Sequence, residues 1–241
     1  MIVAALKDEV REIKARMSLD CVIHFKPATL YRGRLFNKNV DLLVTGIGAD
    51  RMEKGLKEAL ALAAPQALLL VGYAGGASPL AAQGSLILAK EIVDAKSGEH
   101  FKSDVEFLDK ASRLSKENQL NYKVGNIVTV DRVISNPHEK ADLGATYSAI
   151  ALEMEGAAVA REASRLNIPF LVAKAIFDPL EMTLPAFQDC VGPVGEIKPT
   201  KLMERVFKNP KEMMQLPKMQ YLASQARDAV TKFVEAWVQA E

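Results

Sequence analysis

The sequence predicts an α/β fold in which helices cover a mixed or mostly parallel β-sheet. Short apolar, β-rich runs alternate with longer amphipathic runs, and glycine clusters directly follow two of the apolar runs. Apolar residues make up 49% of the 241 residues, which is enough for a globular core. Because neither an internal repeat nor a low-complexity linker interrupts the chain, we expect one domain over residues 1–241.

The predicted strands are the short apolar runs. One of them, at residues 40–45, is apolar apart from Asp41, which is typical of a strand buried on both faces. The full set of strands is expected at residues 2–6, 21–25, 29–36, 40–45, 67–71, 85–93, 122–130, 149–152 and 168–176.

The predicted helices are the longer amphipathic runs. They are expected at residues 8–17, 50–63, 104–118, 137–143 and 154–167. Beyond these, proline and glycine punctuate residues 178–199, and two further helices are expected at 201–208 and 219–239. Residues from about 179 to 241 should therefore form a helical C-terminal extension of the domain.

The charge balance excludes several functions. Lys and Arg number 31 and Asp and Glu number 30, so the net charge is +1 and no overall field attracts a nucleic acid. The chain has two cysteines and three histidines, which are too few and too scattered for a disulfide framework or a zinc site. This cysteine usage predicts a reducing, cytoplasmic location, and we expect no bound metal.

Two apolar segments could be mistaken for targeting or membrane signals. The apolar N-terminus, residues 1–6, runs directly into charged residues and is too short for the core of a signal peptide. Residues 59–89 carry no charge, but proline and glycine interrupt them every few residues. Since a membrane helix needs roughly 20 apolar residues in one run, we interpret this segment as buried strands joined by a glycine loop.

Residues 197–220 combine six cations and two acids with apolar side chains that include four methionines. An adaptable, methionine-rich surface ringed by cations suits peripheral contact with a lipid tail at an anionic interface. An ordinary amphipathic packing face with solvated lysines explains the same pattern. The sequence leaves both interpretations open.

Two glycine clusters follow buried strands. The first, Gly46-Ile47-Gly48, lacks the third glycine of a dinucleotide-binding turn, so a tight strand-to-helix turn is the simpler interpretation. The second begins Gly72-Tyr73-Ala74 and has two more glycines. Glycines at the carboxyl end of a strand let the backbone approach a ligand, so this cluster is a candidate ligand loop as well as a candidate turn.

Three acids stand at the ends of apolar strands. Glu153 and Glu155 follow one strand and precede small residues that open a helix, and Asp178 ends another strand before Pro179. Acids are rarely buried unless they are paired or used. The alternative is that the glutamates favour a helix N-terminus and that Asp178 is a turn residue before proline.

In chain order, these segments resemble the nucleoside phosphorylase/nucleosidase superfamily, and most closely its methylthioadenosine/S-adenosylhomocysteine nucleosidase branch. The six matching segments are A-L-K-D-E-V at residues 5–10, G-I-G at 46–48, G-Y-A-G-G at 72–76, T-V-D-R-V-I at 129–134, A-L-E-M-E at 151–155 and A-I-F-D at 175–178. The resemblance implies a three-layer sandwich around a central mixed sheet. Further downstream, residues 178–210 resemble hopanoid-associated phosphorylases, which implies an apolar 5′ substituent such as hopane.

The resemblance implies cleavage of the N-glycosidic bond of a purine nucleoside of the adenosine type, without a cofactor. It assigns Asp178 to protonating the base at N7 and Glu9 to orienting the attacking water. Glu155 would bind the ribose 2′- and 3′-hydroxyls, and Met154 would line the sugar face. A homodimer is also implied, with a contact near residues 101–108.

The remaining substrate-binding residues follow from the same resemblance. The backbone amides of Val133 and Ile134 would read the purine edge. Further substrate contacts are expected from Glu153, Gly72, Tyr73, Ala74 and Phe177.

The chain departs from the family pattern at three of these positions. Phe177 stands where the family has a serine that orients the catalytic aspartate, so one hydrogen bond to Asp178 is expected to be missing. Val133 replaces an aromatic residue that stacks on the base, and Tyr73 replaces the serine of the glycine loop. These changes affect base identity and efficiency more than the class of reaction.

Hydrolysis is favoured over phosphorolysis. An anion site needs cations or free amides, whereas the strand before Gly72 is apolar and Glu9 would repel a phosphate. Phosphorolysis that gives a sugar 1-phosphate stays open, with Arg51 or Lys7 as compensating cations. A second alternative is a protein that binds a nucleoside without catalysis, which the replacements at Phe177 and Tyr73 motivate.

Overall fold

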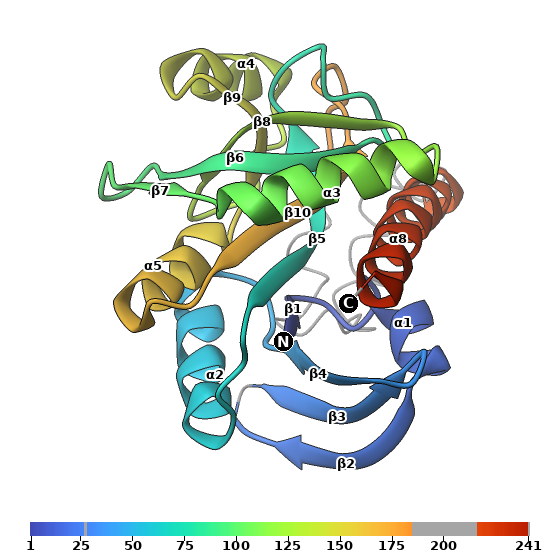
Figure 1. Ribbon diagram of the computed structural model, residues 1–241. Coiled ribbons are helices and arrows are strands. Elements are labelled where there is room, and N and C mark those ends of the chain that lie inside the picture. The colour runs from blue at the N-terminus through green and yellow to red at the C-terminus, as the bar shows by residue number, and fades with distance from the viewer. Residues whose placement is uncertain (27, 185–215, 241) are drawn as a thin grey trace, which may run out of the picture.

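The computed structural model describes residues 1–26, 28–184 and 216–240 (Figure 1). Within them, ten strands form one mixed sheet, which confirms the predicted α/β class. The strands are β1 (Ile2–Ala4), β2 (Ser18–His24), β3 (Thr29–Leu35), β4 (Lys38–Val44), β5 (Leu68–Gly76), β6 (Leu86–Asp94), β7 (His100–Lys102), β8 (Tyr122–Thr129), β9 (Ala149–Glu153) and β10 (Phe170–Asp178).

The helices of the described residues cover both faces of this sheet. They are α1 (Arg11–Arg16), α2 (Ala49–Leu62), α3 (Val105–Glu117), α4 (Pro137–Thr146), α5 (Gly156–Leu166) and α8 (Leu216–Gln239). Apolar residues of α1, α3 and α8 share one core cluster, and those of α2 and α5 share another on the opposite face. This arrangement is the expected three-layer sandwich.

The sheet closes on itself through β5. This strand runs parallel to β10 along most of its length and parallel to β1 at Leu69 and Leu70, and its last residues, Gly75 and Gly76, pair with β9 in antiparallel orientation. Strand β10 also pairs with β6, which pairs with β8, and β8 pairs with β9. Five strands therefore form a ring, and β1, β4, β3 and β2 extend from it.

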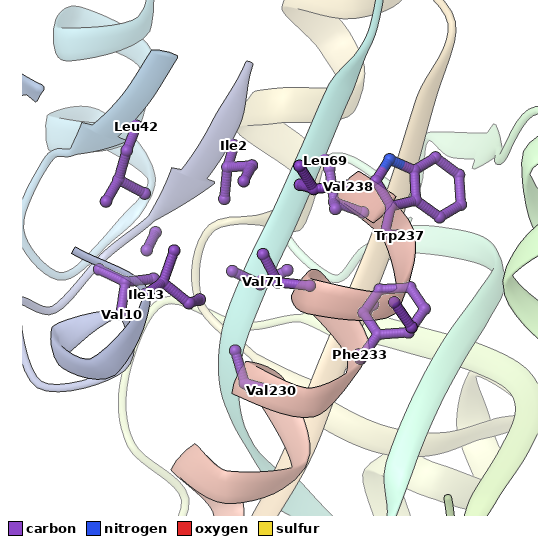
Figure 2. Close-up of a cluster of buried hydrophobic side chains, with 14 of the residues drawn as sticks. Ile2, Val10, Ile13, Leu42, Leu69, Val71, Val230, Phe233, Trp237 and Val238 are labelled. Carbon is purple, nitrogen blue, oxygen red and sulfur yellow. The ribbon is translucent and has the colours of Figure 1, made fainter. Parts of the chain in front are cut away.

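The long C-terminal helix α8 is part of the main core. Figure 2 shows Phe233 and Trp237 of this helix facing Leu69 and Val71 of β5. The ring of Trp237 also meets Phe107 of α3 edge-on, with ring centroids 5.4 Å apart. Burying such large apolar groups fixes α8 against the strands that lead to the candidate site.

Several predicted boundaries were wrong, and the reasons are physical. The helix expected from residue 8 begins at Arg11, because the preceding loop turns back so that Glu9 accepts bonds from nearby backbone amides. The helix expected from residue 154 begins at Gly156, since Glu153 still belongs to β9. The three-residue strand β7 is too short to leave a pattern in the sequence.

The C-terminal predictions are covered only in part. The helix expected at residues 201–208, and most of the segment 197–220, lie outside the described residues. Among the residues that are described, no helix has the length and hydropathy to cross a membrane.

Candidate active site

A cavity of about 670 Å³ opens where the carboxyl ends of β1, β5 and β10 meet. Parallel strands bring their carboxyl ends to the same edge, and this edge is where open α/β sheets bind ligands. Except for Gly72, every residue that the sequence proposed for catalysis or substrate binding lines this cavity. The proposed residues found there are Glu9, Tyr73, Ala74, Val133, Ile134, Glu153, Met154, Glu155, Phe177 and Asp178.

Glu9 is held at the floor of the cavity by three backbone amides. Its Oε2 accepts from the amides of Ala5 and Leu6 at 3.0 and 2.7 Å, and its Oε1 accepts from the amide of Tyr73 at 2.8 Å. Burial raises the pKa of Glu9 to about 7, although the nearby ammonium of Lys174 opposes the shift. A carboxyl with such a pKa exchanges a proton readily near neutral pH.

Gly72 packs against the carboxylate of Glu9 and is not one of the residues that line the cavity. Its φ is +147°, and a Cβ at this position would stand 2.5 Å from Oε1 of Glu9. Only glycine provides both the backbone angle and the space that the carboxylate needs. The substrate contact that the resemblance implies for Gly72 stays a prediction, and the contact that this structure shows for Gly72 is with Glu9.

Lys174 lies in the middle of β10 and is completely buried. Its Nζ stands 3.3 Å from Oε2 of Glu155 and 3.4 Å from Oε2 of Glu153. Burial by itself would lower the pKa of Lys174, but the two carboxylates outweigh it and raise the pKa above its usual value. Lys174 is therefore a permanent cation between the two acids.

Glu153 and Glu155 differ in their surroundings. Glu153 accepts from the hydroxyl of Thr129 at 2.6 Å and from the amides of Glu155 and Gly156, so its oxygens are occupied within the protein. These bonds satisfy backbone amides at the start of α5, which have no partner within the helix. Glu155 accepts from the amide of Gly48 at 2.8 Å, and burial raises its pKa.

Asp178 is paired with a second buried lysine. The ammonium of Lys140, on α4, forms an ion pair with Oδ2 of Asp178 and also donates to the carbonyls of Pro179 and Met182 at 3.1 and 2.9 Å. Burial raises the pKa of Asp178 to about 6, against the opposing effect of Lys140. Phe177 has no hydroxyl that could orient Asp178, and in this structure the ammonium of Lys140 donates a hydrogen bond to Asp178 instead.

One wall of the cavity is tied to α8. The hydroxyl of Tyr73 donates to Oδ2 of Asp8 at 2.8 Å, and Arg227 of α8 donates to both oxygens of the same carboxylate. The ring of Tyr73 stacks on Phe177 with centroids 5.9 Å apart. The tyrosine and the phenylalanine that replace two family serines thus pack against each other, and Met219 of α8 completes the wall.

The sequence as a whole identifies the chain's relatives. The family model described as the phosphorylase superfamily matches residues 1–191. The protein belongs to the phosphorylase superfamily. Two curated members, the 5′-methylthioadenosine/S-adenosylhomocysteine nucleosidases of Staphylococcus haemolyticus and Haemophilus influenzae, are 27% and 28% identical over 193 residues. These matches cover 73% of this chain and 85% and 84% of the relatives.

Solved structures of superfamily enzymes share the fold. The 5′-methylthioadenosine/S-adenosylhomocysteine nucleosidase of Neisseria meningitidis, in complex with methylthio-immucillin-A, matches with a TM-score of 0.78 at 18% identity and covers 100% of this chain and 98% of its own. Native futalosine hydrolase of Helicobacter pylori matches with a TM-score of 0.72 at 18% identity, covering 97% and 95%. The predicted resemblance to the nucleosidase branch of the superfamily is confirmed.

Sequence reasoning missed three residues in or beside this candidate site. Lys174 interrupts an otherwise apolar strand, and that interruption was a usable signal for a buried cation. Lys140 gave no such signal, because a lysine in a short helix is ordinarily solvated. Arg227 lies 219 residues from its partner Asp8, so that contact exists only in the folded chain.

Proposed function

We propose that this protein hydrolyses the N-glycosidic bond of an adenosine-type nucleoside and releases the free base and the free sugar. One observation carries the proposal: a single cavity presents two buried carboxyls, Asp178 and Glu9, whose pKa values of about 6 and about 7 lie near neutral pH. The reaction needs one acid for the leaving base and one acceptor for a proton of water. The names of the nucleosidase relatives support the same activity.

In the proposed reaction, Asp178 gives its proton to N7 of the purine as the electron pair of the glycosidic bond moves into the base. Positive charge then develops on the ribose, and a water molecule adds to the anomeric carbon. Glu9 orients that water and accepts its proton. The result is neutral base and free sugar, with one proton moved from Asp178 to Glu9.

Other residues that line the cavity are proposed to bind the ribose and the purine base. Glu155 would accept hydrogen bonds from the two ribose hydroxyls, since a carboxylate is an acceptor for two donors. Met154 would cover the sugar face, and the amides of Val133 and Ile134 would meet the purine edge. The buried ammonium of Lys174 supports this role for Glu155 because it favours the carboxylate and opposes the burial that raises the pKa of Glu155.

The charges of the cavity favour water over phosphate. Glu9, Glu153 and Glu155 all line it. Among the described lining residues, the one cation is Arg132, and its guanidinium is already ion-paired with Glu139. A phosphate dianion would therefore meet a net negative wall with no unpaired positive partner.

The 5′ substituent is proposed to be apolar. Leu6, Phe177, Leu184 and Met219 supply apolar surface to the same cavity. A hopane side chain is one substituent of this class. Since Met219 belongs to the segment 197–220, the proposal extends to peripheral membrane contact through that segment, which liposome co-sedimentation with and without anionic lipid would test.

We also propose that the chain is a cytoplasmic homodimer built from one domain over residues 1–241, with residues 179–241 as its C-terminal extension. Packing of Phe233 of α8 into the main core supports the single domain.

The proposed dimer has a surface of its own. Val105, which is 70% exposed, supports a subunit contact near residues 101–108. Light scattering at micromolar concentration should give the mass of a dimer, and a monomer would contradict the assembly.

The decisive experiment is a panel of adenosine-type nucleosides with different 5′ groups, assayed with and without phosphate for free base. We expect equal rates in both buffers and free sugar as the second product. Dependence on phosphate with formation of a sugar 1-phosphate would make the protein a phosphorylase. Binding without release of base would make it a non-catalytic nucleoside-binding protein.

A further inference from the structure

The pair formed by Lys140 and Asp178 is unusual for its burial. The side chain of Lys140 is 0% exposed, and that of Asp178 is 6% exposed. Removing two charges from water costs several kcal/mol per ion, and apolar replacements of such pairs are often neutral or stabilising. Stability alone therefore explains poorly why a lysine stands at this position.

All three protons of the Lys140 ammonium have acceptors. They go to Oδ2 of Asp178 and to the backbone carbonyls of Pro179 and Met182. An ammonium has three donors and no acceptor, so this one has none left for a substrate. Lys140 therefore does not contact the substrate directly. It can affect the reaction only by way of the groups that it binds, which are Asp178 and the backbone of Pro179 and Met182.

The start of α4 and its close packing on the strands place the side chain of Lys140 beside Asp178. Asn136 caps the helix by accepting from the amide of His138 at 2.8 Å, and Lys140 follows in the first turn. At Gly144, a Cβ would stand 2.4 Å from the carbonyl oxygen of Ala77, so only glycine lets α4 lie this close to the strands. The cap and the close approach together place the ammonium beside β10.

We infer that Lys140 is the positioning residue of the catalytic acid: it holds one oxygen of Asp178 and stabilises the carboxylate that remains after the proton has passed to the base. This inference rests on the proposed hydrolysis. With Oδ2 held by the ammonium, Oδ1 is the oxygen that meets the purine. Charge that develops on Asp178 during proton transfer is then met by a fixed cation in a site shielded from water.

No other cation has this role toward Asp178 in the described part of the chain. The main effects on its pKa are burial, which raises the pKa, and the charge and hydrogen bond of Lys140, which lower it. The other titratable side chains that line the cavity come from separate segments and are Glu9, Tyr73, Arg132, Glu153 and Glu155. Loss of Lys140 should thus remove the larger of the effects that oppose burial and leave only the weaker hydrogen bond from the backbone amide of Asp178.

The test is the pH dependence of base release by Lys140→Met. We expect kcat to fall by about 10- to 100-fold, as for other losses of alignment at a reacting group. KM should stay close to the wild-type value, and the pH optimum should move upward because Asp178 holds its proton to higher pH. Asp142→Asn, an exposed charge change on the same helix, is the matched control and should leave rate and optimum unchanged.

A double-variant cycle separates positioning from a merely structural role. In the Asp178→Asn background, Lys140→Met should cause no further loss of kcat, since its only route to the reaction is gone. Multiplicative losses in the double variant, or a lower rate with an unchanged pH optimum, would overturn the inference. If Lys140→Met does not fold, Lys140→Gln removes the same charge, and the same upward shift of the optimum is expected.

The wild-type enzyme distinguishes failure of the inference from failure of the proposed function. If wild type releases base and the lysine variants keep its pH optimum, only the role of Lys140 is wrong. If wild type releases no base from any nucleoside of the panel, the hydrolysis itself is wrong and the role of Lys140 is rejected with it.

Discussion

Gly72 lies directly against the carboxylate of Glu9: a Cβ built on the glycine would stand 2.5 Å from Oε1 and 2.7 Å from Cδ. The next residue, Tyr73, donates its amide to the same Oε1 at 2.8 Å. The absence of a side chain at Gly72 therefore leaves space for the Glu9 carboxylate, and the amide of Tyr73 fixes that carboxylate by a hydrogen bond. This relationship links the glycine loop of β5 to the loop after β1.

Gly72→Ala should impair catalysis more than it impairs folding. The substitution strains a backbone angle that L residues rarely adopt, at a cost of about 1–3 kcal/mol, and it also displaces the Glu9 carboxylate. We expect kcat for base release to fall by about 10²-fold, as for a reacting group moved by about 1 Å. Gly98→Ala is the matched control, because φ is +74° there but no atom lies within 4 Å of its Cβ. An equal loss of activity in both variants would contradict the explanation.

Asp178→Asn should lower turnover by roughly 10²–10⁴-fold, which is the usual contribution of a positioned acid. The amide cannot protonate the base, yet it fills nearly the same volume, so nucleoside binding measured by calorimetry should survive. Normal turnover in this variant would mean that another group protonates the leaving base.

Glu9→Gln should separate binding from hydrolysis. The amide keeps the shape of the side chain but cannot take a proton from water, so kcat should fall by roughly 10²-fold or more while KM changes little. Wild type should release base equally fast in phosphate-free buffer. If phosphate accelerates release in wild type and Glu9→Gln retains full activity, the assigned role of Glu9 is wrong.

The pH profile of kcat/KM should be a bell with its maximum between pH 6 and 7, set by pKa values of about 6 for Asp178 and about 7 for Glu9. Activity requires Asp178 protonated and Glu9 ionised. Because the pKa of the acid lies below that of the base, the reactive form is a minor one, and its population is greatest between the two pKa values. Below pH 6 the rate falls because more of Glu9 is protonated, and above pH 7 it falls because more of Asp178 has lost its proton. A rate that stays constant from pH 5 to 9 would exclude this pair of roles.

Asp8→Asn should loosen the tie between α8 and the cavity. Arg227 would lose its ion pair with a carboxylate, and Arg227 and Tyr73 would have to share the single acceptor oxygen of the amide, at a cost of about 0.5–2 kcal/mol because Asp8 is partly exposed. We expect a lower melting temperature and a higher KM, since Met219 of α8 lines the cavity. Lys232→Met removes an exposed ion pair of the same helix and should change neither quantity.

The sequence alone determined the fold class and named the candidate residues that the structure brings to one cavity. Glu9 was found through the resemblance to the nucleosidase family, whereas Glu155 and Asp178 also stood out because each follows an apolar strand, and the carboxyl ends of parallel strands collect at one edge of a sheet. That inference needs only the alternation of strands and helices. It therefore survived the errors of two or three residues at the starts of α1 and α5.

Only the tertiary structure decided what each acid contacts. Lys140 reaches Asp178 across 38 residues, and Arg227 reaches Asp8 across 219. Neither contact has a local pattern, because it depends on how closely a helix docks on the sheet: α4 through Gly144, and α8 through Phe233 and Trp237. Periodicity records which face of an element is apolar, whereas the partner of a buried charge depends on packing between distant elements, and that packing also sets the pKa at which the charge can act.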